Sequence, residues 1–499
     1  MEFNFFKKLK SENKILSDFK NENGVILGKN KGKLLIDNSK EHILLTMPPR
    51  SGKGASCIIP TALKTWKESL FVFDLGGENY HLTSGARKEK LGNHILRFSP
   101  SSKNSCHYNP LAEVRILSKY EKEDIKMITE VIFNRKELKS EEDILCSNFS
   151  SKFITSVIYY VLYRNFLKKP KFIYENGEKI PVSNATIMEV IDFIKGKNEK
   201  MEQKQIKTFE EKIKKICEEN IVEKFGSDEK IKNYVKEKLK IVYETDTDLE
   251  IINNGNHPKI VENFSKYSEL SFFFPILKQS IYNLSIFDIP EIKENISTSD
   301  FRMVDLMNFD KPVSFYFVIS PADIIKCYSI IKIFIKQMFD RLTPEIDYRN
   351  EIKHKWKMLA IMDEFPSLGK IEEIEMGMGY FAGYGMKMMI VLQSLDQLFK
   401  IYGDKNRFLS NCKIQVFGQA NDKITADYIN NLCKEKNEKF ITNEELLSFP
   451  LNKVIIKKFG EKPIIAEKFL YYKEKEYFEL SKIPFVFSEK LCDDVEKNI

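Results

Sequence analysis

Two segments of this sequence carry residue types that suit phosphate chemistry. Residues 47–54 (MPPRSGKG) join an apolar run to a helix-like stretch, and Asp363-Glu364 ends the apolar run 358–362. In a phosphate-binding loop, backbone N–H groups and the helix N-terminus bind the anion, and a lysine reaches the β and γ phosphates. The loop therefore predicts a nucleotide site made by Arg50, Ser51, Gly52, Lys53, Gly54 and Ala55.

The loop departs from the general pattern G-x-x-x-x-G-K-[ST] at two positions. Met47 stands in place of the first glycine, and Gly54 replaces the hydroxyl residue that ordinarily binds magnesium. Taken alone, this segment fits an unrelated turn as well as it fits a phosphate loop. Further residues are needed to decide between the two.

The acidic pair Asp363-Glu364 supplies that second indication. Asp363 is expected to hold Mg²⁺ through its water shell, and Glu364 to orient or deprotonate the attacking water. Two acids after a strand can also cap an exposed edge. Downstream of a phosphate loop, however, they predict a site for ATP with Mg²⁺, in which Lys53 and Glu364 act on the substrate and Asp363 is the metal ligand.

A third polar position ends another apolar run. Gln393 follows the run 388–392 and precedes Ser394. Ligands of parallel sheets bind at the carboxyl ends of the strands, so Gln393 is expected to sense the γ phosphate or to position water. The alternative is a residue that caps a helix. Asp74 and Glu78 occupy the same rim, where they could equally be ordinary loop carboxylates.

The elements that must position these residues alternate along the chain. Short apolar runs followed by helical stretches are typical of βαβ units, and therefore of an α/β fold with a mainly parallel sheet. We expect helices over 52–65, 323–342 and 367–381. The expected strands are 42–47, 70–75, 95–98, 313–320, 358–362, 387–392 and 414–418, with a hairpin over 453–459 and 464–469.

The middle of the chain has a different texture. Residues 113–296 are long, charged and helix-patterned, with apolar positions spaced three and four apart over 206–216 and 231–239. This segment predicts an all-α insertion between two parts of the nucleotide-binding domain, 1–112 and 297–499. Its lysines alternate with glutamates, which favours a solvated helix surface over a basic nucleic-acid face.

Composition narrows the class of protein. The chain has 499 residues, 42% of them hydrophobic, and a formal net charge of +7, which permits a nucleic-acid partner without requiring one. The eight cysteines and six histidines are scattered, which argues against a zinc site and indicates reduced thiols in a cytosolic protein. No apolar run reaches the roughly 18 to 20 residues needed to cross a bilayer, so we expect a soluble chain.

The combination of motifs resembles the TraG-like coupling ATPases of type IV secretion and conjugation. DEFPSLGK (363–370), GYG (383–385) and QS (393–394) are highly specific for that family, and its blocks lie in order along nearly the whole chain. Further matching blocks are TMPPRSGKGASCIIPTAL (46–63), FVFDLGGENYHLTSG (71–85), YNPL (108–111), DKPVSFYFVISPAD (310–323), AIMDEFPSLGKI (360–371), GYGMK (383–387), VLQSLDQL (391–398) and the tail 446–472.

The resemblance implies a RecA-like motor domain interrupted by an all-α domain. It also implies a ring, expected to be a hexamer, that uses ATP to pass DNA, relaxase–DNA complexes or effector proteins towards a type IV secretion channel. Gly54 after the lysine is usual in this family, whereas Met47 is less usual. The family commonly begins with a transmembrane anchor, which we do not expect in this sequence. The chain is then expected to be a naturally soluble relative, a trimmed form, or a protein held at the cytoplasmic face of the inner membrane by partners.

One charge expected from related ring motors has no obvious source. Such motors can carry a trans-acting arginine shortly before the glycines that correspond to Gly383 and Gly385, and here Phe381-Ala382 stands instead. Lys387, Arg50 or another residue would then supply it. Two alternatives to a secretion motor stay open: a non-catalytic nucleotide-binding adaptor that docks cargo, and a soluble DNA translocase outside secretion.

Overall fold

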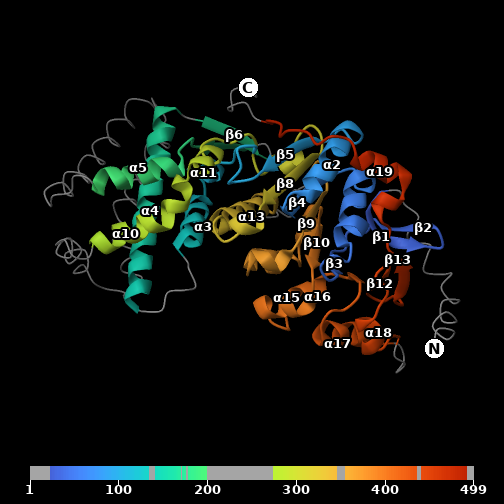
Figure 1. The fold of residues 1–499 in the computed structure, drawn as a ribbon. Helices are drawn as coiled ribbons and strands as arrows, with labels where there is room; N and C mark the ends of the chain where they lie inside the picture. Colours follow the sequence, from blue (N-terminus) through green and yellow to red (C-terminus); the bar gives the residue numbers. More distant parts are fainter. Residues whose placement is uncertain are drawn as a thin grey trace.

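A computed structural model describes residues 23–133, 141–169, 171–175, 178–198, 273–344, 354–434 and 440–491. An 11-stranded sheet runs through the molecule in the order β2-β1-β13-β12-β11-β3-β10-β9-β4-β8-β5 (Figure 1). The seven strands from β11 to β5 are parallel to their neighbours, and the other pairings are antiparallel. The predicted α/β class with a mainly parallel sheet is therefore confirmed.

The expected strands form close to their predicted bounds. The parallel strands are β3 (Ile43–Thr46), β4 (Ser69–Leu75), β5 (His94–Phe98), β8 (Val313–Ile319), β9 (Met358–Met362), β10 (Met386–Leu392) and β11 (Ile414–Phe417). The C-terminal hairpin consists of β12 (Lys453–Lys458) and β13 (Ile464–Glu467). A second hairpin, β1 (Val25–Asn30) and β2 (Lys33–Asp37), was not predicted from the sequence and extends the sheet beyond β13.

Side-chain alternation divides the core between the two faces of the sheet. Phe71 and Phe73 of β4 join one core cluster, while Leu70 and Val72 join the other. Residues two apart on a strand share a face, so a strand buried on both faces is apolar throughout. On one face, Phe334 of helix α13 (Tyr328–Leu342) packs among aromatic rings from β4, β5 and β8.

Helices cover both faces of the sheet. The predicted helix 52–65 forms as wide-turned segments, η3 (Gly54–Ile58) and η4 (Thr61–Thr65). The helix expected over 367–381 is instead broken into η8 (Phe365–Leu368), α14 (Glu372–Gly377) and η9 (Phe381–Tyr384), because Gly369 takes a positive φ of 64° that interrupts a helix. The remaining elements are α2 (Glu78–Glu89), α12 (Asp305–Asn308), η7 (Pro321–Asp323), α15 (Leu395–Tyr402), α16 (Arg407–Asn411), α17 (Lys423–Leu432), α18 (Asn443–Leu447), η10 (Tyr471–Lys473) and α19 (Lys475–Ser481).

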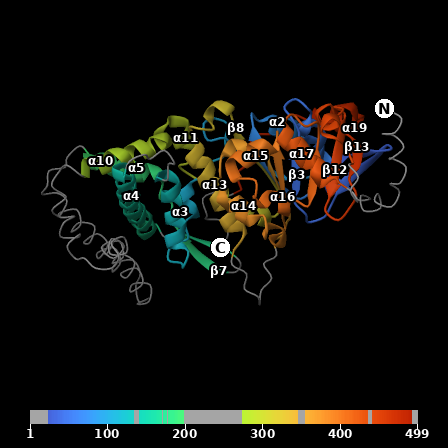
Figure 2. The same ribbon diagram turned by 90° about the horizontal axis from the view of Figure 1, so that it is seen from below.

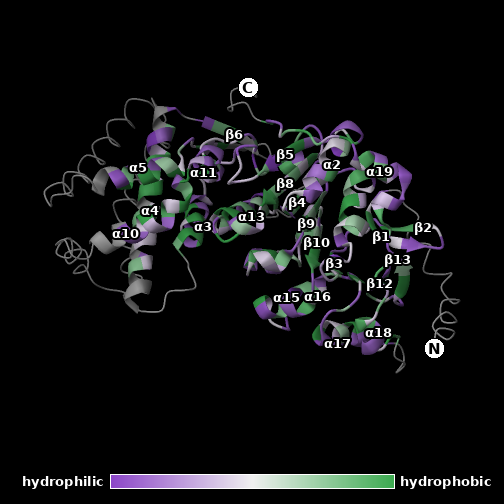
Figure 3. Ribbon diagram, in the orientation of Figure 1, coloured by the Kyte–Doolittle hydropathy of each residue, from purple (hydrophilic) through white to green (hydrophobic). Residues whose placement is uncertain are grey.

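A lobe apart from the sheet contains the segment that was expected to be helical (Figures 1 and 2). Its long helices carry both apolar and polar residues, as the hydropathy colouring of Figure 3 shows. The prediction of an all-α segment is wrong at one place, because β6 (Lys171–Glu175) and β7 (Glu178–Val182) form a hairpin. The helices are α3 (Glu121–Phe133), α4 (Glu141–Lys168), α5 (Ile187–Asn198), α10 (Phe273–Leu284) and α11 (Pro290–Asn295), with the short turn η6 (Ser285–Asp288). The short turn η5 (Pro110–Glu113) precedes the lobe.

Two further expectations concern this segment. The amphipathic stretches 206–216 and 231–239 lie outside the residues that the structure describes, and the domain bounds at 113 and 296 stay a prediction. The apolar run 153–162 lies within α4, as expected for a buried helix. In the part of the chain that is described, no helix is both long and apolar enough to cross a membrane.

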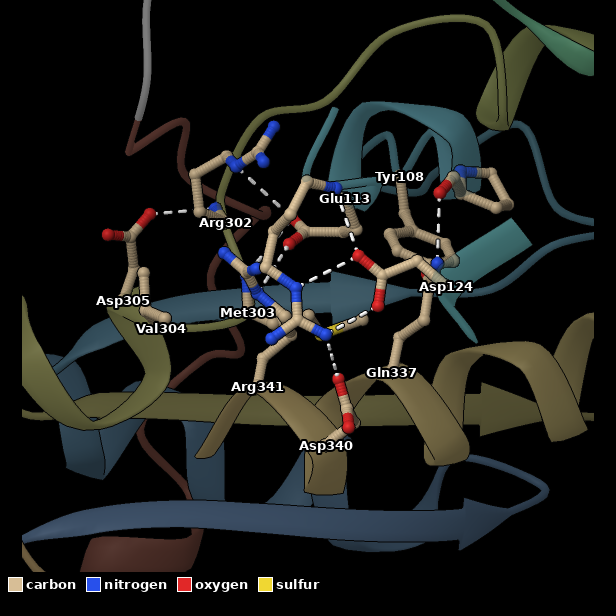
Figure 4. Close-up of polar contacts among 12 residues, drawn as sticks. Tyr108, Glu113, Asp124, Arg302, Met303, Val304, Asp305, Gln337, Asp340 and Arg341 are labelled. Carbon is tan, nitrogen blue, oxygen red and sulfur yellow. Dashed lines mark hydrogen bonds and ion pairs between the residues drawn. The ribbon is translucent and has the colours of Figure 1, made fainter. Parts of the chain in front are cut away.

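A buried ionic network joins the lobe to the sheet (Figure 4). Glu113 lies 3.3 Å from Nε of Arg302 and 3.5 Å from Nε of Arg341, and it also accepts the backbone N–H of Met303 at 3.2 Å. Glu113 and Arg341 are almost fully buried. Because Glu113 precedes the lobe, Arg302 follows it and Arg341 belongs to α13, this carboxylate ties both connections of the lobe to the helix that packs on the sheet.

The C-terminal stretch protects the edge of the sheet. The backbone N–H of Glu489 donates to the Ile95 carbonyl at 2.8 Å, and its carboxylate accepts the N–H of Ile95, also at 2.8 Å. An uncovered edge strand presents unpaired backbone groups to other chains. These contacts place the chain after α19 along β5.

Candidate nucleotide site

Four neighbouring parallel strands end at the candidate site. They are β3, β10, β9 and β4, in that order across the sheet. The loop 47–54 follows β3, Gln393 follows β10, Asp363 follows β9, and Asp74 lies near the end of β4. All of these residues therefore lie along one edge of the sheet, where parallel-sheet proteins bind ligands.

A tight turn shapes the phosphate loop. The N–H of Ser51 donates to the Pro48 carbonyl at 3.3 Å, and the Ser51 hydroxyl donates to the same oxygen at 2.6 Å. Arg50 takes a positive φ of 57° inside the turn, and Gly52 takes a φ of 84°. Lys53 then starts the helical segment, with φ of −55°. Gly52 thus occupies a conformation that favours glycine.

Met47 fits the loop without needing the properties of glycine. Its φ is not positive and its side chain is buried, with Cγ 3.0 Å from the place where Gly418 would carry a Cβ. A glycine is required where φ is positive or where the backbone closely approaches another group. Here the close approach is made by the backbone of Gly418, directly after β11, and the Met47 side chain packs against it.

Glu364 is held by two of the predicted site residues. It forms an ion pair with Lys53, and Nε2 of Gln393 donates to its Oε2 at 2.8 Å. Ser394, whose Oγ accepts from the Gln397 N–H, is the residue that caps α15. The helix-capping alternative for Gln393 is therefore wrong, and its amide is directed at the acidic pair.

The carboxyl group of Asp363 lies in a buried position that disfavours its charged form. Burial raises the pKa of its carboxyl to about 6, with Lys53 opposing and the charges of Glu364 and Asp74 adding to the rise. Its Oδ1 accepts the Glu364 N–H at 3.0 Å. A nearby cation would favour the charged form of this carboxyl.

Of the two other rim carboxylates, Asp74 has a structural role. Its oxygens accept the N–H groups of Asn79 at 3.3 Å and Tyr80 at 2.8 Å, and also the side-chain amide of Asn79 at 3.0 Å, so it caps the start of α2. Burial raises its pKa. Glu78 is exposed in the first turn of the same helix.

The donor set fits Mg²⁺ bound together with a nucleotide. Among the described residues there is no cluster of three or more histidine, cysteine or acidic side chains that could hold a metal alone. Mg²⁺ commonly uses one or two carboxylates, with phosphates and water completing its shell. Asp363, whose buried carboxyl is destabilised in its charged form, would be the protein ligand.

Lys387 does not lie near this edge. It is almost fully buried at the amino end of β10, where its ammonium pairs with Asp37 and donates to the Ser39 carbonyl at 3.0 Å. The expectation that Lys387 could supply a trans-acting charge is therefore wrong, because its neighbours already satisfy it inside the fold. Arg50 is exposed. A pocket bordered by Ser39 and Lys357 also lies at the amino ends of the strands, opposite the phosphate loop.

Sequence reasoning missed one residue of the site. Lys468 directly follows β13, and its ammonium donates to the Ser51 carbonyl at 2.7 Å. The only signal was indirect, since Lys468 falls within the tail 446–472 that resembles the coupling ATPases. Its contact with the loop requires the C-terminal hairpin to return to the sheet beside β1, which spacing alone does not reveal.

Solved structures share this architecture. The coupling protein TrwBΔN70, in a trigonal form with sulphate, matches with a TM-score of 0.55 at 10% identity over 93% of each chain. TrwB in complex with ADP and Mg²⁺ matches with a TM-score of 0.55 at 11% identity, again over 93% of each chain. The fold is accordingly that of the RecA-type ATPases.

The family follows from the sequence comparison. The model for Type IV secretory system Conjugative DNA transfer matches residues 4–437, so the chain belongs to this family of coupling proteins. Conjugal transfer protein TraG of Escherichia coli is 27% identical over 408 residues, covering 79% of this chain and 55% of the relative. Protein VirD4 of Rhizobium radiobacter is 26% identical over 422 residues, covering 83% and 51%. The chain thus spans about half the length of these relatives.

Proposed function

We propose that this chain hydrolyses ATP, with Mg²⁺, to drive the transfer of DNA or relaxase–DNA complexes into a type IV secretion channel. The observation that carries the proposal is the contact of Lys53 and Gln393 with Glu364 at the carboxyl ends of adjacent strands. Membership of the conjugative DNA transfer family and the binding of ADP and Mg²⁺ by the related TrwB support it.

The contacts suggest how the site works. Without nucleotide, the Lys53 ammonium is neutralised by Glu364. Arriving phosphates compete for Lys53, which releases one oxygen of Glu364 to accept a proton from the attacking water. Gln393 keeps its hydrogen bond to the other oxygen and so fixes the direction of the carboxylate. Bound Mg²⁺ would neutralise phosphate charge beside Asp363.

The partners are proposed from the family. They are DNA or a relaxase–DNA complex, the channel components and effector proteins as further cargo, with a homo-hexamer as the active assembly at the cytoplasmic face of the inner membrane. Contacts to a nucleic-acid backbone would be salt-sensitive and show little base preference. Arg50, exposed in the loop, is the remaining named candidate for the trans-acting charge.

ATP turnover by two site variants tests the catalytic part. Lys53→Ala removes the phosphate-binding charge, and Glu364→Gln removes the proton acceptor, so each is expected to lower turnover by about 100-fold or more. The exposed pair Lys64 and Glu476 offers matched controls, Lys64→Ala and Glu476→Gln, because its side chains are 44% and 64% exposed. Both controls should retain wild-type turnover.

The same assay separates a motor from an adaptor. A wild-type chain that binds ATP with Lys53-dependent affinity but does not turn it over would support the non-catalytic adaptor. Turnover unchanged by both Lys53→Ala and Glu364→Gln would refute the proposed site. Phosphate release at saturating ATP is the measurement.

A further inference from the structure

Lys468 contacts the phosphate loop from a distant part of the chain. The residue is 8% exposed, follows β13 directly, and donates from Nζ to the Ser51 carbonyl at 2.7 Å. Leu470 lies close by, with Cδ2 3.6 Å from the place where Gly52 would carry a Cβ. The C-terminal hairpin, β12 and β13, therefore leads into a segment that lies against the loop.

The charge of Lys468 is incompletely matched. An ammonium has three donors, and the structure gives this one a single acceptor, the Ser51 carbonyl. None of the ion pairs formed by the described residues includes Lys468. Arg87, another buried cation, differs because it donates to Ser314 and to the carbonyls of Ala62, Trp66 and Glu68.

The direction of the Ser51 carbonyl has a consequence for the loop. In a trans peptide the C=O and the following N–H point to opposite sides. By holding the Ser51 carbonyl, Lys468 turns the Gly52 N–H away from itself. Backbone N–H groups are what such loops offer to phosphate, so the orientation of this peptide matters for binding.

We infer that Lys468 is a positioning residue for the nucleotide: it orients the Ser51–Gly52 peptide and adds a second positive charge to the loop that contains Lys53. The inference rests on the proposed nucleotide site and extends it to the C-terminal hairpin. Strand β12 of the hairpin pairs with β11, and strand β13 pairs with β1. Because Lys468 directly follows β13, a movement at the end of the hairpin would shift the phosphate loop.

The electrostatics agree with this role. Burial lowers the pKa of Lys468 to about 8, and the Cys57 thiol on η3 is the other titratable group that acts on it. Burial raises the pKa of that thiol to about 12, so it stays neutral across the relevant range. Holding Lys468 charged in this buried position therefore lowers the stability of the nucleotide-free chain below about pH 8. The attraction between the ammonium and a bound phosphate would offset this loss.

Binding of ADP with Mg²⁺ to the full chain tests the inference by calorimetry. Lys468→Met keeps the apolar stem and removes the charge, and should weaken ADP binding by about tenfold or more while leaving the Tm of the nucleotide-free chain equal or higher. Lys468→Arg should recover most of the affinity. Lys457→Met is the matched control, since the Lys457 ammonium also donates to a backbone carbonyl, that of Glu461, at the other end of the hairpin.

A pH series distinguishes charge from packing. Wild-type affinity should fall between about pH 7.5 and about pH 9.5 as Lys468 loses its proton, and the slope should flatten in Lys468→Met. Equal ADP affinity in Lys468→Met and wild type would overturn the inference. A lower Tm without rescue by Lys468→Arg would also overturn it, in favour of a packing role. Failure of the wild type itself to bind ADP would instead refute the proposed nucleotide site.

Discussion

At the scale of single residues, Glu364 is the residue that contacts two other predicted site residues. It accepts from Lys53 and Gln393 while its backbone takes a left-handed φ of 50°. A non-glycine residue in this region stores roughly 1 to 3 kcal/mol of strain, which persists where the surroundings impose it. Here Lys53, at the start of η3, and Gln393, directly after β10, both hold the Glu364 side chain. These contacts fix the position of the Glu364 carboxylate beside the phosphate loop.

A buried histidine provides a test of the core beneath the site. Burial lowers the pKa of His42 to about 4, and its ring bonds the Met378 carbonyl and the Met388 N–H, each at 3.0 Å. Between about pH 4 and 6.5 the unfolded chain binds more protons here, so stability falls as pH is lowered through this window, by up to about 3 kcal/mol.

His42→Gln should remove this dependence, because glutamine can replace both hydrogen bonds without titrating. Urea unfolding at about pH 6.5 and about pH 4 gives the comparison. We expect the wild type to lose up to about 3 kcal/mol more than the variant over this interval. Equal losses in both proteins would show that His42 does not govern acid stability.

At the scale of elements, the sequence predicted most of the parallel sheet but not its extension. Runs such as 70–75 are apolar throughout because both faces are buried, so their strand character shows in the sequence. The hairpin β1–β2 was missed because its polar residues, such as Lys29 and Asn30, mask its alternation. The other site residues were found because they belong to sequence motifs. Lys468 was not, because it contacts Ser51, which lies 417 residues away in the sequence.

The connection of the lobe to the sheet yields a prediction about stability. Glu113→Ala would remove the carboxylate that Arg302 and Arg341 share in a buried setting, and should lower the free energy of unfolding by about 3 to 5 kcal/mol. Glu130→Ala is the control, because Glu130 pairs with Lys126 on the exposed face of α3 and should change stability by less than about 0.5 kcal/mol.

Urea unfolding of both variants measures the difference. If Glu113→Ala were no less stable than Glu130→Ala, the ionic network would have no part in fixing the lobe. Because the lost contacts join the lobe to the sheet, we expect the lobe of Glu113→Ala to unfold locally before the rest of the chain. Hydrogen exchange on α3 of the lobe would then rise in Glu113→Ala before it rises on the sheet strands.

At the scale of the whole molecule, the sheet with its covering helices and the lobe meet away from the candidate nucleotide site. The lobe connects through Glu113 and Arg302, whereas the phosphate loop is flanked by β11, β10 and the C-terminal hairpin (Figures 1 and 2). Under the proposed function, ATP would bind at one end of the molecule and the lobe at the other end would be free to bind cargo.

Stimulation of ATP turnover by DNA tests the central claim most directly. Phosphate release is measured for the wild-type chain at saturating ATP and Mg²⁺, with and without single- and double-stranded DNA, and Glu364→Gln sets the background. A DNA-coupled motor predicts turnover that rises severalfold with DNA and loses this rise at high salt, as backbone contacts are screened. Turnover at the Glu364→Gln background, or unaffected by DNA at concentrations that saturate binding, would contradict it.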